Sequence, residues 1–177
     1  MNEIIKAILS RRSIRKFKSE QISDDELNSI LEAGKFAPSA MNQQSWHFTV
    51  IQNKEIIAKV NEVCKENMNR AENKDLNLFY NAPTLIIVSG DEKAVAPECD
   101  ASLALENMFL AAASLNIGSC WIHSPRALAS SDEGNKLISE LGIPSGYKIV
   151  GSGIFGYKAS EAPASAKRKE NSVNIVK

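Results

Sequence analysis

The chain has 177 residues, of which 44% are hydrophobic and 24% charged, as in an ordinary globular domain with its own core. Lysine plus arginine and aspartate plus glutamate both number 21, so the net charge is zero. No overall field therefore favours nucleic acid or an acidic membrane surface. No linker, repeat or low-complexity tract divides the chain, and we expect one domain over residues 1–177.

The cysteines and histidines are too few and too scattered for the common metal sites. There are three cysteines, no Cys-x-x-Cys motif and two histidines, so we expect no metal and reduced core thiols in a cytoplasmic protein. The first residues lack the regions of a signal peptide, and the apolar stretch 101–117 is too short and too polar to span a bilayer. The cysteines are Cys64, Cys99 and Cys120.

Periodic patterns predict helices and strands along the whole chain. Apolar residues recur at helical spacing over 2–11, and Ser23 with Glu26 forms a capping box that starts a second helix. A continuous β-branched run at 84–89 predicts a buried strand. The other expected elements are strands at 46–51, 119–122 and 147–157, helices at 54–69, 101–117 and 131–141, a mobile, lid-like stretch at 70–81, and a last short strand around Val173 and Ile175.

A basic segment follows the first predicted helix. Between Arg11 and Lys16 the chain carries four cations and the hydroxyl of Ser13. Guanidinium groups beside a hydroxyl suit a phosphate, which accepts bidentate, charge-assisted hydrogen bonds. Cations also suit the C-terminal end of any helix, so these residues alone leave a phosphate site and a solvated basic turn equally open.

A second motif resolves the choice through a family resemblance. Residues 37–48 read Ala-Pro-Ser-Ala-Met-Asn-Gln-Gln-Ser-Trp-His-Phe. The chain resembles the flavin-dependent nitroreductase family, which opens with Arg-x-Ser-x-Arg/Lys-x-Phe and continues, one helix later, with Pro-Ser-x-x-Asn-x-Gln-x-Trp. The resemblance covers nearly the whole chain. Its further matches are Asn81-Ala82-Pro83, Gly118 to Ile122, Gly156-Tyr157 and Lys167 to Asn171.

The resemblance implies an α+β fold with a mainly antiparallel central sheet flanked by helices. It further implies an intertwined homodimer with C-terminal strand exchange, FMN as cofactor, and NADH or NADPH as electron donor. An apolar strand that follows the polar stretch 158–171 needs a strand to pair with, which agrees with the exchange. A frayed tail is the alternative.

The first motif is implied to hold the cofactor's polar groups. Arg11 and Ser13 match positions at the FMN phosphate and ribityl chain, with Arg12 beside them. Arg15 matches a cation near the flavin N1 and C2 carbonyl. A cation there favours electron acceptance, because hydride transfer to N5 leaves negative charge at N1 and O2. The C-terminal cations implied to reach the phosphate are Lys167 and Arg168.

The second motif is implied to contact the flavin from the other subunit, and Ile122 to Ser124 to approach flavin N5 or O4. His123 departs from the Gly, Glu or Arg common in relatives, so we expect its backbone to act, with its side chain a weak catalytic candidate. The loop residues implied at the flavin are Pro38, Ser39, Ala40, Asn42 and Gln44. Gln44 and Trp46 are also expected to brace the loop. The residues implied near N5 are Ile122, His123 and Ser124.

The residues alone contain no self-sufficient catalytic set, since no Ser-His-Asp order, metal triad or P-loop is present. The stretch Gly151 to Gly156 matches the dinucleotide fingerprint Gly-x-Gly-x-x-Gly, but no βαβ unit surrounds it. Its glycines instead predict a strand that passes close to a neighbour. A phosphate-binding chain without reactive side chains suits a cofactor enzyme.

The family resemblance implies an NAD(P)H-dependent FMN oxidoreductase that reduces nitroaromatics, quinones or related oxidants by two electrons, with ping-pong kinetics. Two alternatives stay open. One is different flavin chemistry in the same fold, such as ene-reduction, dehalogenation or flavin breakdown. The other is a flavin-binding sensor or storage protein without turnover. The expected partners are small molecules and a second copy of the chain, with no nucleic acid and no membrane.

Overall fold

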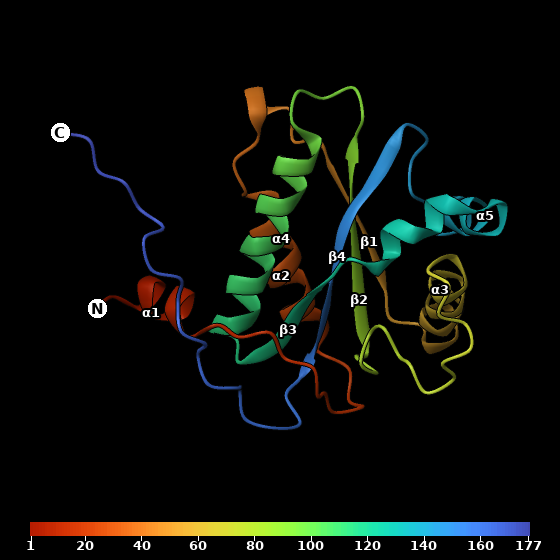
Figure 1. Cartoon of the computed structure of the whole chain (residues 1–177), viewed down its shortest axis with the longest axis horizontal. Helices are drawn as coiled ribbons and strands as arrows, with labels where there is room; N and C mark the ends of the chain where they lie inside the picture. The colour runs from red at the N-terminus through yellow and green to blue at the C-terminus, as the bar shows by residue number, and fades with distance from the viewer.

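A computed structural model describes residues 1–177, and its centre is a four-stranded antiparallel sheet of order β1-β2-β4-β3 (Figure 1). The strand β2 is buried along almost its whole length, as its continuous apolar run predicts. The expected α+β class with an antiparallel sheet is confirmed. The strands are β1 (Trp46–Ile51), β2 (Thr84–Asp91), β3 (Ile117–Ile122) and β4 (Tyr147–Tyr157).

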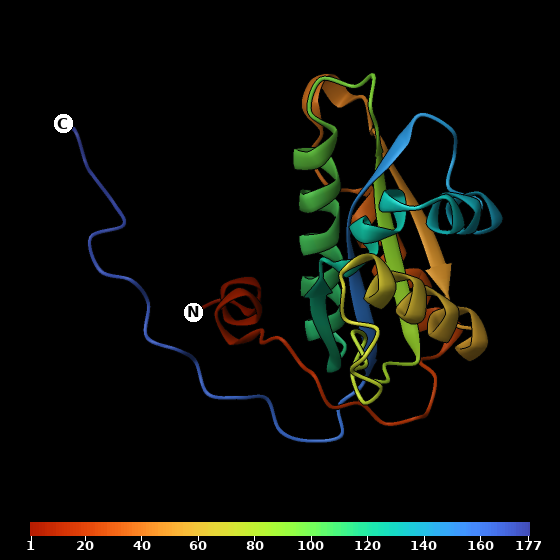
Figure 2. The same cartoon turned by 45° about the vertical axis from the view of Figure 1, so that its right-hand side comes forward.

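Helices cover both faces of the sheet, because successive side chains of β2 point to opposite sides. Leu85 and Ile87 pack with the helices α3 and α5, whereas Ile86 and Val88 pack with α2 and α4 (Figures 1 and 2). Two hydrophobic cores thus lie on either side of one sheet. The bounds are α1 (Glu3–Ser10), α2 (Asp24–Lys35), α3 (Lys54–Asn67), α4 (Pro97–Ser114) and α5 (Asp132–Glu140). No helix has the apolar length that a bilayer crossing requires.

Both chain ends stand away from this body. None of the residues of α1 is buried, and its apolar side chains Ile4, Ile5, Ile8 and Leu9 are exposed. The last residues run as an extended tail beside α1 (Figure 2). The short strand expected around Val173 and Ile175 is absent from the single chain, because a strand needs a neighbour for its backbone hydrogen bonds.

The expectation that all three cysteines are core thiols holds for two of them. Cys64 and Cys120 are core thiols, and burial raises the pKa of Cys64 to about 12, but Cys99 lies exposed in the first turn of α4. The glycine-rich strand β4 does pass close to neighbours. A Cβ atom on Gly151 would lie 2.3 Å from the ring of Trp121, so only glycine fits there without a shift.

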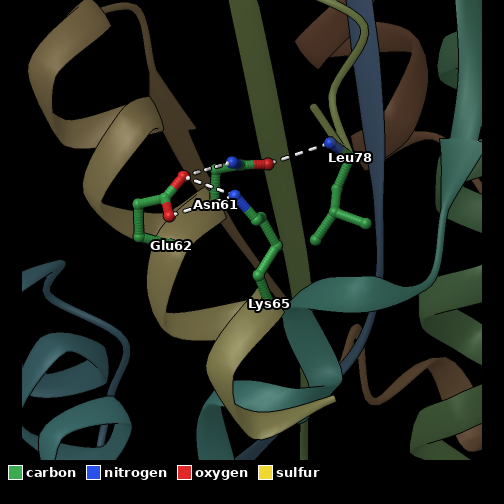
Figure 3. A network of polar contacts seen from close by, with 4 residues as sticks. All are labelled: Asn61, Glu62, Lys65 and Leu78. Atoms are coloured by element: carbon green, nitrogen blue, oxygen red, sulfur yellow. Dashed lines mark hydrogen bonds and ion pairs between the residues drawn. The ribbon is translucent and has the colours of Figure 1, made fainter. Parts of the chain in front are cut away.

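The stretch 70–81 is anchored over its second half rather than mobile throughout. The backbone N–H of Leu78 donates to Asn61 Oδ1 at 2.9 Å, and Asn61 Nδ2 donates to Glu62 Oε1 at 2.9 Å (Figure 3). Lys65 Nζ donates to both oxygens of the same carboxylate, at 3.2 and 3.1 Å. Phe79 is fully buried. The polar network of α3 therefore fixes the chain just before β2.

This network predicts opposite effects for its two charges. Glu62→Gln leaves the ammonium of Lys65, which is 2% exposed, without a carboxylate. The free energy of unfolding should fall by about 1.5–3 kcal/mol, the scale of a hydrogen bond to a charged group. Lys65→Met keeps the apolar stem and removes the buried charge, so stability should change little or rise. Urea unfolding of both variants at pH 7 measures the difference.

The same carboxylate predicts the pH dependence. The hydrogen bond from Lys65 lowers the pKa of Glu62 below its ordinary value of 4.5. Ionised Glu62 therefore contributes its full stabilisation above pH 4.5. This contribution to the free energy of unfolding is lost as pH falls through the lower pKa of the folded state. The stability gap between wild type and Glu62→Gln should close in acid. Equal effects of Glu62→Gln and Lys65→Met at pH 7 would contradict this account.

Candidate functional site

The basic segment after α1 is fastened to the edge of the sheet. Ser13 forms a parallel bridge with Ser119 of β3, and the N–H of Ile14 donates to the Ser119 carbonyl at 2.9 Å. Further along, the N–H of Lys18 donates to the Tyr157 carbonyl at 2.9 Å. Ile14 is buried, so in this extended segment Ser13 and Arg15 project to the opposite side. A hydroxyl and a cation thus share one face.

A polar hollow of about 250 Å³ lies beside this segment, between the ends of α1, α4 and β4. Arg11 approaches it from α1, with Nε 3.5 Å from Glu106 Oε1 and Cζ 5.9 Å from the centre of the Phe109 ring. Cations and hydroxyls in one hollow suit an anionic group. The polar residues that line the hollow are Ser10, Arg11, Arg12, Asn116, Ser119 and Lys158.

Arg12 has a structural role at the C-terminal end of α1, as cations at a helix end commonly do. Its Nη1 donates to the carbonyls of Leu9 at 2.8 Å and Arg11 at 2.7 Å, so it satisfies acceptors at the end of α1. Its Nε atom is nevertheless buried without a hydrogen-bond partner. Arg12 therefore supports the helix end and still holds one unused donor.

Buried polar atoms without a hydrogen-bond partner indicate where a polar ligand could bind. Three such atoms occur, on Arg12, Thr49 and Ser124. An unsatisfied buried donor or acceptor costs about 1–3 kcal/mol, so each needs an explanation. Arg12 and Ser124 are among the residues predicted to hold the cofactor. Both therefore fit a group that brings its own acceptors and donors.

The end of β3 presents the second part of the predicted set. Ile122 is buried and its carbonyl accepts the Ser152 hydroxyl at 2.8 Å. His123 is exposed, and its ring stacks on Trp121 with 6.4 Å between centroids. The side chain of His123 forms no ion pair, so nothing in its surroundings marks it as an acid or base. Ser124 begins a 3-10 helix that ends at Ser130.

The predicted loop 38–44 lies at the other end of α4. The N–H of Ala40 donates to Asp100 Oδ1 at 2.9 Å, and the Ser45 hydroxyl donates to Asp100 Oδ2 at 2.7 Å. Asp100 is 2% exposed. Its role as the anchor of the loop depends on a contact sixty residues apart, which no local pattern reveals.

Strained backbone marks the same loop and one residue outside the predicted set. Apart from glycines and asparagines, positive φ occurs only at Met41 (53°), Gln44 (49°) and Tyr80 (53°). This conformation costs roughly 1–2 kcal/mol for such residues and gathers at functional sites. Within the loop, the Gln44 N–H donates to Ser39 Oγ at 3.0 Å, and its side chain donates to Asn42, so Gln44 braces the loop as expected. Tyr80, by contrast, belongs to neither of the two sequence motifs, so the sequence did not mark it as a site residue.

A single chain does not bring all predicted residues together. The loop 38–44 meets α4 at Asp100, whereas the polar hollow meets it at Ala113. A helix rises about 1.5 Å per residue, so about 20 Å separate the two places. Lys167 and Arg168 lie exposed in the extended tail, where Lys167 pairs with Glu170 at 2.8 Å (Figure 2).

Comparisons with known proteins find relatives over most of the chain. A family model described as Nitroreductase family matches residues 8–157. A protein of Archaeoglobus fulgidus, provisionally named NADH dehydrogenase/NAD(P)H nitroreductase, is 35% identical over 91% of this chain and 88% of its own length. A Bacillus subtilis protein named FMN reductase [NAD(P)H] is 28% identical over 98% of this chain and 73% of its own length.

A solved structure extends the likeness to three dimensions. The nitroreductase of Bacteroides fragilis with bound FMN is 37% identical, covers 100% of both chains and superposes with a TM-score of 0.91. The two sequence motifs stand on the same scaffold that the family model spans, with the basic segment on the sheet edge and the second loop at the start of α4. The chain therefore belongs to the nitroreductase family.

Proposed function

We propose that this protein is an FMN-dependent oxidoreductase that takes electrons from NADH or NADPH and reduces a small-molecule oxidant. The observation that carries the proposal is its full-length likeness to a nitroreductase with bound FMN. The unused donor of Arg12 and the unused hydroxyl of Ser124 support it, because both belong to the residues predicted at the cofactor. Bound FMN would supply the redox chemistry by accepting a hydride at N5 and passing two electrons onward.

The residues of this chain would then bind and orient the cofactor. Arg11 would hold the phosphate, with Lys158 adding a further cation at the same hollow. Ser13 would bind the cofactor from the other face of the segment, the face opposite Ile14. Arg15 projects on the same side as Ser13, which suits a cation that offsets negative charge on the reduced flavin ring. NAD(P)H and the oxidant would use one cleft in turn, which gives ping-pong kinetics.

The exposed surfaces support assembly as a homodimer. An apolar groove lies between α1, α2 and α4, and α1 presents further uncovered apolar side chains. A helix of eight residues without a buried face is not stable by itself and needs a packing partner. A second copy would cover this surface and bring its own loop 38–44 to a site about 20 Å along α4. The residues that line the apolar groove include Ile4, Ala7, Ala33, Phe36, Leu110 and Ala111.

The cofactor proposal predicts a yellow protein that releases FMN on denaturation. Its Arg11→Ala variant should bind FMN about 10- to 100-fold more weakly, because a charge-assisted hydrogen bond contributes about 1.5–3 kcal/mol. Titration of the apoprotein with FMN, followed by flavin fluorescence, measures the dissociation constant. Lys59→Ala removes an exposed cation that pairs with Glu140 between α3 and α5, away from both halves of the site, and it should bind as the wild type does.

A second control removes the ion pair of Arg11 without removing Arg11. Glu106→Gln takes the carboxylate away from the Arg11 guanidinium, which stays charged. FMN affinity should therefore hold or increase in this variant. An Arg11→Ala protein with wild-type FMN affinity would remove Arg11 from the cofactor site.

The electron-transfer proposal is tested by anaerobic mixing of the purified yellow protein with NADH or NADPH. The flavin absorbance should bleach, and a nitroaromatic or a quinone should restore it. Analysis of the products then separates nitro and quinone reduction from ene-reduction and dehalogenation. A flavin that neither nucleotide reduces would contradict the enzyme proposal and favour a binding protein without turnover.

The assembly proposal predicts that the tail couples dimerisation to FMN binding. Replacing Val173 and Ile175 together by Asp charges the alternating apolar face of the tail and should weaken both the dimer and FMN binding. Asn174→Asp places a charge on the other face and serves as the matched control. Sedimentation velocity gives the assembly state, and FMN titration gives the affinity. A monomeric variant with full FMN affinity would show that the site is built within one chain.

A further inference from the structure

Tyr80 is held in a conformation that its own side chain disfavours. Its φ angle is 53°, and Asn81 follows with φ 55°. The other non-glycine, non-asparagine residues with positive φ, Met41 and Gln44, both lie in the loop predicted to contact the flavin. Bulky residues keep this geometry only where their surroundings impose it, which is common at functional sites.

The surroundings impose it from both sides. Before Tyr80, the N–H of Leu78 donates to Asn61 Oδ1 (Figure 3). The N–H of Phe79 donates to Asn77 Oδ1 at 2.9 Å. After Tyr80, the N–H of Ala82 donates to the Phe79 carbonyl at 3.0 Å, directly before β2. Yet the Tyr80 side chain is 40% exposed, so the fold does not use it as core. The anchors thus present the ring instead of burying it.

The ring faces a residue of the predicted cofactor site. The Cζ atom of Arg15 lies 5.8 Å from the centre of the Tyr80 ring, within the range of a cation–π contact. Arg15 forms no ion pair within the chain, so this contact is what orients its guanidinium. The two residues come from segments 65 positions apart, one fastened to β3 and the other to α3.

We infer that Tyr80 is a positioning residue that holds the Arg15 guanidinium where it offsets negative charge on the reduced cofactor. The inference rests on the proposed FMN function. A cation stabilises developing charge most when its position is fixed beforehand, since no reorganisation is then needed. Tyr80 acts through Arg15 and through its ring face, so its hydroxyl is dispensable.

The test uses the FMN-loaded protein and a double-mutant cycle. Tyr80→Ala removes the ring but keeps a side chain at positive φ, and Tyr80→Phe keeps the ring. Tyr80→Ala should lower the midpoint potential of the bound FMN and slow its reduction by NADH about two- to fivefold, the factor of an exposed cation–π contact. Tyr80→Phe should match the wild type. Arg15→Ala should lower the potential further, and adding Tyr80→Ala to it should change nothing more.

Urea unfolding of the apoprotein shows whether a lower FMN potential in a Tyr80 variant results from a destabilised fold. Tyr80→Gly relieves the positive φ, so the urea midpoint should stay equal or rise while the FMN potential falls as in Tyr80→Ala. An unchanged potential in Tyr80→Ala with FMN bound, or additive effects with Arg15→Ala, would overturn the inference. A wild-type protein that binds no FMN would overturn the proposed function and the inference with it, and this outcome is distinct because no potential exists to measure.

Discussion

The helix α4 keeps the two halves of the predicted cofactor site apart, and the rest of the structure follows from this separation. One half is fastened to the sheet edge beside the end of α4, and the other is tied to Asp100 in its first turn. Because this helix is rigid, the two halves stay about 20 Å apart along it within one chain. The proposed homodimer would bring the two halves together, and the uncovered apolar side chains of α1 and the unpaired tail support that proposal.

The sheet provides the rigid frame that this arrangement needs. Its strand β2 is buried between two cores, and Gly151 on β4 leaves room for the ring of Trp121, which comes from the paired strand β3. The segment with Ser13 and Arg15 adds to the β3 edge by backbone hydrogen bonds, which fix its register to the sheet. Side chains on such a segment are positioned more tightly than on a free loop.

Strain and its compensation occur together at the site. Met41 and Gln44 adopt positive φ in a loop tied down by Asp100 and Ser39, and Tyr80 does so between the anchors that Asn61 and Asn77 supply. Hydrogen bonds to and within each loop thus hold the strained residues in place. These anchors are polar residues at least as important for the site as the motif residues that they support.

The sequence by itself determined the order of the elements, because hydrophobic periodicity and the capping box at Ser23 are local signals. Its two motifs indicated the family, and the family resemblance implied the antiparallel α+β class. Only the tertiary structure decided where the motifs lie relative to each other, that Asp100 anchors a distant loop, and that Tyr80 faces Arg15. Such contacts join residues tens of positions apart, and backbone strain arises from packing, so neither leaves a pattern along the chain. The tail illustrates the same limit: alternation at Val173 and Ile175 indicates a strand, but a strand forms only where a neighbouring edge supplies its hydrogen bonds.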